Sequence, residues 1–169
     1  FYSTYLPELY KLVLKQSSEF LKETLNEQQR KFRKRSRPKI LLATNLDDAL
    51  NMYSKYKHNL LGVISDVGFT VHKDDSPEME KLDAGIELVR HIKADNEKMP
   101  ILLQSSQDSI SSVAQELGVG FLRKYSKTLM LQLADFIKEE FGFGDFVFRD
   151  ADHVEYGRAA NLKELEAMV

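Results

Sequence analysis

Three apolar runs of this sequence each end in a polar residue that could take part in chemistry: Asp66, Ser105 and Lys124. A carboxylate such as that of Asp66 can act as a nucleophile in group transfer. A hydroxyl and an ammonium can hold phosphoryl oxygens, and the ammonium also stabilises the charge that develops during transfer. If the fold brings the three residues together, they form a site for phosphoryl chemistry.

We expect the three apolar runs to be strands, at Leu60–Ser65, Ile101–Gln104 and about 119–123. The continuous apolar run at Leu60–Ser65 is typical of a parallel strand that is buried on both faces. Apolar residues recur at helical spacing between and after the three runs, which predicts helices at about 46–53, 84–95, 110–117 and 127–141. Alternating strands and helices predict a parallel sheet with helices on both faces. In such a sheet ligands bind at the carboxyl ends of the strands, where the three polar residues are expected.

The N-terminal part of the chain predicts a long amphipathic helix at 7–35, which ends in a basic cluster at 30–37. Pro38 stops this helix. We interpret the basic cluster as a solvated helix end, where cations complement the helix dipole. A short apolar strand is expected next, at Ile40–Ala43.

Two further segments lie outside the predicted strands and helices of the sheet. Residues 67–82 are polar and irregular, and we expect them to form a loop. Residues 142–169 predict two short strands around a turn, followed by a short helix. We therefore expect one domain at 1–141 and, at 142–169, a C-terminal appendage or the start of another module.

Composition excludes several classes of function. The 169 residues include 43% hydrophobic and 30% charged residues, which is enough to build a globular core. The net charge of −2 argues against a nucleic-acid partner.

The chain has no cysteine, which excludes disulfides and thiolate catalysis and favours a reducing, cytoplasmic location. No apolar run approaches the roughly 20 residues that span a bilayer, so no membrane partner is expected. Because the chain starts at Phe1 and not at Met, we expect it to be an excised piece.

Four stretches of the sequence resemble the receiver domain of two-component response regulators. Residues 60–66 (LLGVISD) are similar to the strand that carries the family's phosphoacceptor aspartate. Residues 83–88 (DAGIEL) resemble the start of its third helix. Residues 100–106 (PILLQSS) and 118–124 (GVGFLRK) resemble its fourth and fifth strands. The resemblance covers roughly residues 5–141.

The resemblance implies roles for individual residues. Asp66 would accept a phosphoryl group from a histidine kinase or another phosphodonor, and Ser105 and Lys124 would contact that group. Phe121 matches the aromatic residue that repacks on switching. The backbone carbonyl of Gly68 would match a ligand of Mg²⁺, a cation that prefers carboxylate and carbonyl oxygens. The output would fall on a fused or associated module, and a homodimer is a further possibility; the chain itself is not expected to be a stand-alone enzyme.

Three features depart from the receiver pattern. The acidic pair that completes the Mg²⁺ site would lie upstream of Phe1, together with the first strand, since Ile40–Ala43 aligns best with the second strand. Tyr125 follows Lys124 where the family usually has proline. The loop at 67–82 is longer than usual. The chain also resembles the receiver segment of large proteins that carry a phosphoenolpyruvate synthase or pyruvate phosphate dikinase-like module, in which an acid-bearing strand precedes this segment.

The sequence therefore predicts a flavodoxin-like, CheY-like three-layer sandwich that lacks its first strand. We expect this gap to be filled by a tail strand such as Phe146–Phe148, by exchange between chains, or by rearrangement of the sheet. Two other functions stay open: a phosphorylation-inactive pseudo-receiver that acts as an interaction or dimerisation module, and a small-molecule-binding flavodoxin-like domain. Asp66 could also only cap its strand, and Phe121 could be an ordinary core residue.

Overall fold

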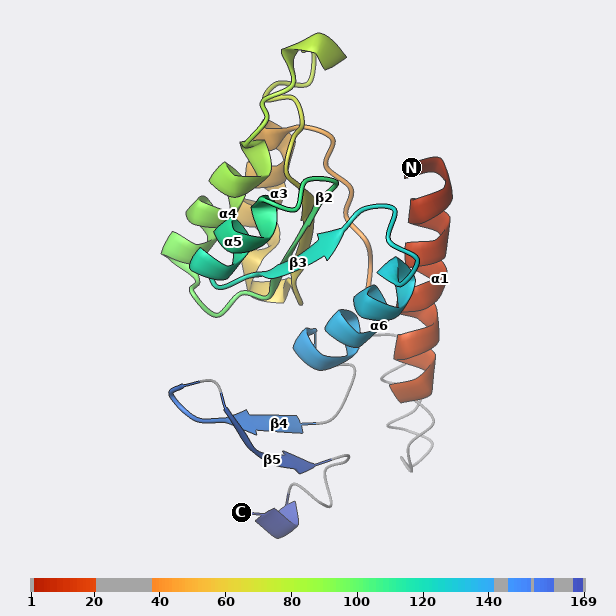
Figure 1. Ribbon diagram of the computed structural model, residues 1–169, viewed down its shortest axis with the longest axis vertical. Helices are drawn as coiled ribbons and strands as arrows, with labels where there is room; N and C mark the ends of the chain where they lie inside the picture. Colours follow the sequence, from red (N-terminus) through yellow and green to blue (C-terminus); the bar gives the residue numbers. More distant parts are fainter. Residues whose placement is uncertain (1, 21–37, 142–145, 153, 160–165, 169) are drawn as a thin grey trace. The chain divides into compact units, whose positions relative to one another are not determined.

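A computed structural model of the chain describes residues 2–20, 38–141, 146–152, 154–159 and 166–168 (Figure 1). The chain divides into two compact units, of which one is Leu41–Gln132 and the other combines Phe1–Ile40 with Leu133–Val169. All three residues predicted to carry chemistry lie in the unit Leu41–Gln132, so this unit holds the candidate site.

A three-stranded parallel sheet runs through the unit Leu41–Gln132. Its strands are β1 (Val63–Asp66), β2 (Ile101–Ser105) and β3 (Gly120–Arg123), in the order β1-β2-β3. Among the described residues, this sheet has no fourth strand. The predicted α/β class with a parallel sheet is confirmed.

Three α-helices of this unit lie on the same side of the sheet (Figure 1). They are α3 (Leu46–Tyr56), α4 (Ala84–Asp95) and α5 (Ile110–Glu116), with the short 3₁₀ helices η1 (Lys57–Asn59) and η2 (Pro77–Met79) between them. As the sequence predicts, Asn45 caps α3: its side chain accepts a hydrogen bond from the backbone N–H of Asp48 at 2.8 Å. Gly118 follows α5 with φ of 63°, a left-handed conformation that favours glycine at a helix end.

The hydrophobic core lies between these helices and the sheet. Val89 and Ile92 of α4 pack there with Ile101 and Leu103 of β2, and all four are fully buried. The intervening residues of β2, Leu102 and Gln104, are also almost fully buried, although their side chains point to the other face of the strand. β2 is therefore covered on both faces. The run at Leu60–Ser65, where such cover was expected, is not: three of the four residues of β1 are only half-buried, and Leu61 is exposed.

The predicted strand at Ile40–Ala43 is wrong. Residues 38–43 form no regular secondary structure, and Leu41 and Leu42 are exposed. An extended segment becomes a strand only when a neighbour pairs with its N–H and C=O groups. The next pairing along the chain is the isolated parallel bridge between Asn45 and Thr70.

The other unit contains α1 (Tyr2–Phe20) and the hairpin of β4 (Phe146–Arg149) with β5 (Glu155–Ala159). The helix α6 (Leu129–Glu140) begins in one unit and continues into the other. α1 starts earlier than predicted and takes Pro7 inside it. Because proline has no N–H, the bond that residue 7 would make to the carbonyl of residue 3 is absent.

Three predictions concern the two ends of the chain: the long first helix, the final helix and the tail strand. The second half of the predicted helix at 7–35, and the start of the final helix, lie outside the described residues. The tail strand does not fill the gap in the parallel sheet, because Phe146–Arg149 pairs antiparallel with Glu155–Ala159 in a separate two-stranded sheet. In a hairpin the backbone N–H and C=O groups of the two strands pair with each other along their shared edge. This pairing forms between residues close together in the sequence and does not need the parallel sheet.

Candidate functional site at the carboxyl end of the sheet

The structure brings Asp66 and Lys124 together. The Nζ atom of Lys124 lies 2.5 Å from the Asp66 carboxylate, at the ends of β1 and β3. The two strands are separated by β2, so the pair joins residues 58 positions apart in the sequence. The Lys124 side chain is 15% exposed and the Asp66 side chain is 18% exposed. Partial burial strengthens the attraction between the two charges, because less water screens them.

The end of the intervening strand β2 places Ser105 between these two residues. In the sheet register Asp66 lies opposite Gln104, and Ser105 lies opposite Arg123. The backbone carbonyl of Ser105 accepts a hydrogen bond from the N–H of Lys124 at 2.8 Å. The Ser105 hydroxyl accepts one from the N–H of Gln107 at 3.1 Å, so its own proton is not used in that bond. The carboxylate, hydroxyl and ammonium thus stand at neighbouring strand ends, as predicted.

The backbone at Asp66 is held from two sides. The Asp66 carbonyl accepts a hydrogen bond from the Ser65 hydroxyl at 2.7 Å, and the Asp66 carboxylate accepts one from the N–H of Val67 at 3.2 Å. From α4, the N–H of Gly85 donates to the carbonyl of Val67 at 2.8 Å. A β-carbon at position 85 would collide with the carbonyl oxygen of Asp66. The start of α4 can approach the strand end this closely because residue 85 is glycine.

The residues that follow Asp66 form the predicted loop, which is closed by backbone pairing. Phe69 and Lys81 exchange two hydrogen bonds, of 3.2 and 3.0 Å. This bridge brings the Glu80 carboxylate beside Gly68, where an added β-carbon would meet it. The loop also contacts the first turn of α3: the Nδ1 atom of His72 lies 2.7 Å from the Asp47 carboxylate. This contact raises the pKa of His72 above its ordinary value.

The described residues do not supply a complete Mg²⁺ site. Asp66 and the Gly68 backbone offer oxygen ligands, but no group of three or more acidic, histidine or cysteine side chains in the described part of the chain could hold a metal ion. The Asp66 carboxylate instead carries the Lys124 ammonium. Mg²⁺ usually keeps several water ligands and binds through one or two carboxylates, so water and phosphoryl oxygens would complete its coordination here.

Phe121, the candidate switch residue, lies on β3 opposite Leu103. It is half-buried and packs against the hydrophobic core cluster. This position links the strand that carries Lys124 to the core, in agreement with the alternative that Phe121 is a core residue. It leaves the predicted repacking untested.

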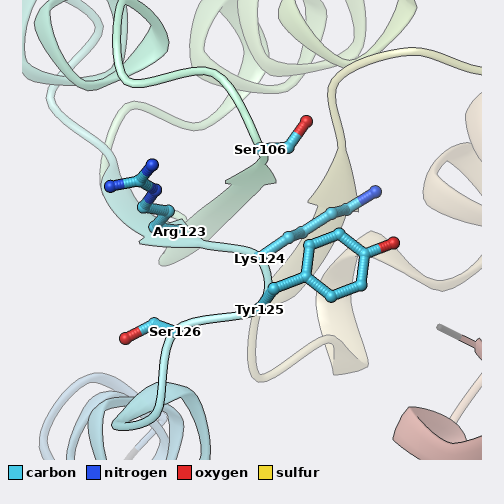
Figure 2. A pocket seen from close by; sticks show the side chains of 5 residues that line it. All are labelled: Ser106, Arg123, Lys124, Tyr125 and Ser126. Atoms are coloured by element: carbon cyan, nitrogen blue, oxygen red, sulfur yellow. The ribbon is translucent and has the colours of Figure 1, made fainter.

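A pocket of about 380 Å³ opens beside Lys124 (Figure 2). It is lined by Ser106, Arg123, Lys124, Tyr125 and Ser126. Tyr125 has a φ of 63°, and it is the only non-glycine residue in the described part of the chain with a positive φ. In the sequence, Tyr125 stands out only as a departure from proline. No sequence pattern marks Ser106, Arg123, Ser126 or Gly85, because their places at the site depend on which segments become neighbours.

None of the helices in the described part of the chain has the length and apolar character needed to cross a membrane. Comparison with known proteins finds no matching family model, no matching curated protein and no matching solved structure.

Proposed function

We propose that the chain is a receiver domain of the flavodoxin-like, CheY-like kind, which accepts a phosphoryl group on Asp66. The observation that carries the proposal is the ion pair between Lys124 and Asp66 at the carboxyl end of a parallel sheet, with Ser105 on the strand between them. A carboxylate can act as the nucleophile, and a cation and a hydroxyl can hold the oxygens of the phosphoryl group.

In this function a carboxylate oxygen of Asp66 attacks the phosphorus of the donor. A P–O bond to Asp66 forms as the bond from phosphorus to the leaving group breaks, and the leaving group departs with that electron pair. The ammonium of Lys124, now beside Asp66, would move to an oxygen of the transferred group. The Ser105 hydroxyl would donate its free proton to another phosphoryl oxygen.

The phosphoryl group would change the charge at this edge of the sheet and so shift the balance between two arrangements of the surrounding segments. The donor would be a histidine kinase or a small phosphodonor. The output would act on a fused or associated module, with a phosphoenolpyruvate synthase-like or dikinase-like enzyme as one candidate.

The test is to treat the 169-residue chain with acetyl phosphate and Mg²⁺ and to follow its intact mass. We expect a gain of one phosphoryl group, which is lost in Asp66→Asn. The matched control is Asp108→Asn, because Asp108 is an exposed carboxylate of the same unit that pairs with Arg123 at 3.2 Å. A chain that gains no phosphoryl group, or gains it equally in Asp66→Asn, would overturn the proposal.

A second candidate is a phosphorylation-inactive module that binds a protein partner. Its support is that no group of three or more acidic, histidine or cysteine side chains in the described part of the chain could hold a metal ion. In that case the parent chain itself would gain no phosphoryl group from acetyl phosphate. The same mass measurement therefore separates the two candidates.

A further inference from the structure

Gln104 places an amide side chain in the most deeply buried strand of the parallel sheet. It follows three apolar residues of β2 and is only 2% exposed. Burying an amide costs free energy unless its donor and acceptor groups find partners. Within the described part of the chain, no buried side-chain nitrogen or oxygen atom lacks a hydrogen-bond partner. A leucine would fill a similar volume without needing such partners, so the amide calls for a reason beyond packing.

The sheet register places Gln104 on the same face as the Asp66–Lys124 pair. Gln104 lies opposite Asp66 of β1 and opposite Leu122 of β3. Residues opposite each other in a parallel sheet project from the same face, and every second residue of a strand returns to that face. The N–H of Lys124 still bonds to the carbonyl of Ser105, so β3 follows β2 up to this point. Lys124, two residues beyond Leu122, therefore lies on the face of Gln104.

The ion pair crosses β2 over Gln104. Neighbouring strands lie about 4.8 Å apart, so β1 and β3, with β2 between them, are separated by roughly 10 Å. The Asp66 carboxylate and the Nζ atom of Lys124 nevertheless lie 2.5 Å apart, so the two side chains meet above β2. The residue of β2 opposite Asp66 on this face is Gln104. The pair thus covers the amide at a strand end, where a side chain would otherwise meet water.

An amide suits this place because it is both a donor and an acceptor. Its NH₂ group can donate to a carboxylate, and its carbonyl oxygen can accept from an ammonium. Methionine and leucine have similar size but no N–H group to donate. Hydrogen bonds to charged groups are also shorter and stronger than those between neutral groups.

We propose that Gln104 is a positioning residue for the phosphoryl acceptor. Its amide holds the Asp66 carboxylate and the Lys124 ammonium in the arrangement from which Asp66 attacks phosphorus. This inference rests on the proposed function of Asp66. Gln104 takes no part in bond making and neither gains nor loses a proton. When Lys124 moves to the transferred group, the amide keeps the carboxyl group of Asp66 oriented.

The first test removes the amide and measures the rate of phosphoryl uptake. We expect Gln104→Met to gain its phosphoryl group from acetyl phosphate and Mg²⁺ about tenfold more slowly than the parent chain, as for the loss of one hydrogen bond to a charged group. The matched control is Leu102→Met, because Leu102 projects from the same face of β2 and is 1% exposed. It should be labelled at the parent rate. A purely structural role of Gln104 would lower the stability of Gln104→Met in urea and leave the labelling rate of the folded chain unchanged.

The second test observes the amide directly and does not depend on phosphoryl transfer. The side-chain NH₂ signals of Gln104 are followed in a proton–nitrogen NMR spectrum, after assignment through the bonds to its backbone. We expect these signals to move in Asp66→Asn and in Lys124→Met. They should stay in place in Asp108→Asn, which removes an exposed carboxylate of the same unit.

The outcomes separate the positioning role from the proposed function. Amide signals that stay in place in Asp66→Asn and Lys124→Met would overturn the positioning role while leaving Asp66 as the phosphoryl acceptor. The same holds if Gln104→Met is labelled at the parent rate, or if Leu102→Met is slowed equally. A parent chain that gains no phosphoryl group would overturn the proposed function, and the positioning role with it.

Discussion

At the scale of single residues, the Asp66–Lys124 pair links the chemistry of the site to the stability of the sheet. Both side chains are largely buried, so neither charge is well solvated without the other. We expect Lys124→Met to lower the free energy of unfolding by about 1–3 kcal/mol, because it leaves a largely buried carboxylate without its cation. Urea denaturation of the parent chain and the variant measures this loss.

The double variant Asp66→Asn/Lys124→Met separates the pair from its surroundings. It removes both charges, so its loss of unfolding free energy should be smaller than the sum of the losses in the two single variants. Substitutions of residues in direct contact are not additive. Strict additivity of the two single effects would show that the pair is not coupled in solution.

His72 is a described residue whose pKa the structure raises above its ordinary value of 6.5. The hydrogen bond to Asp47 is the largest cause of its raised pKa, and the attraction of the same carboxylate adds to it. Because folding raises this pKa, the charged pair stabilises the folded chain fully below the ordinary value of 6.5. That contribution is lost as the pH rises through the higher value of the folded state. In an NMR titration, Asp47→Asn should move the midpoint of His72 down toward 6.5; an unchanged midpoint would contradict the contact.

At the scale of the elements, the junction of β1 and α4 depends on Gly85. An alanine there favours a helix by about 1 kcal/mol in isolation. In this structure its β-carbon would meet the backbone carbonyl of Asp66, which cannot move aside as a flexible side chain could. We therefore expect Gly85→Ala to destabilise the chain by about 1–3 kcal/mol, the usual range for overpacking.

The control on the same helix is Arg90→Ala, since Arg90 is exposed. Thermal or urea unfolding of this variant should stay within about 0.5 kcal/mol of the parent chain. If Gly85→Ala proved as stable as Arg90→Ala, the close approach of α4 to the end of β1 would be wrong.

At the scale of the whole molecule, the described chain divides into two units, and the hydrophobic core around β2 lies in the unit Leu41–Gln132. Two leucines of this unit have opposite environments. Leu103 is fully buried in β2, and Leu42 is 57% exposed in the segment that was expected to be a strand.

This contrast predicts the outcome of two identical substitutions. Leu103→Ala should lower the free energy of unfolding by about 2–5 kcal/mol, because it leaves a cavity in the core. Leu42→Ala should change it by no more than about 0.5 kcal/mol, because the side chain already meets water. Equal and large losses, measured by denaturant unfolding, would mean that 40–43 is covered in solution.

Local features of the sequence were enough to predict most of the elements around the site. The apolar run before Ser105, the spacing of Ile86, Val89 and Ile92, and the cap at Asn45 each depend on residues close together in the chain. The order of Asp66, Ser105 and Lys124 at strand ends predicted one shared edge, because parallel strands of one sheet end on the same side.

The sequence by itself therefore determined the α/β class, the parallel strands and the chemical types at their ends. Only the tertiary structure decided whether an apolar run finds a strand partner: Ile101–Ser105 does, on both sides, and Ile40–Ala43 does not. It also decided that Gly85 touches the Asp66 carbonyl and that Tyr125 turns left-handed beside Lys124. Pairing and close approach depend on segments far apart in the chain, so no local pattern of residues encodes them.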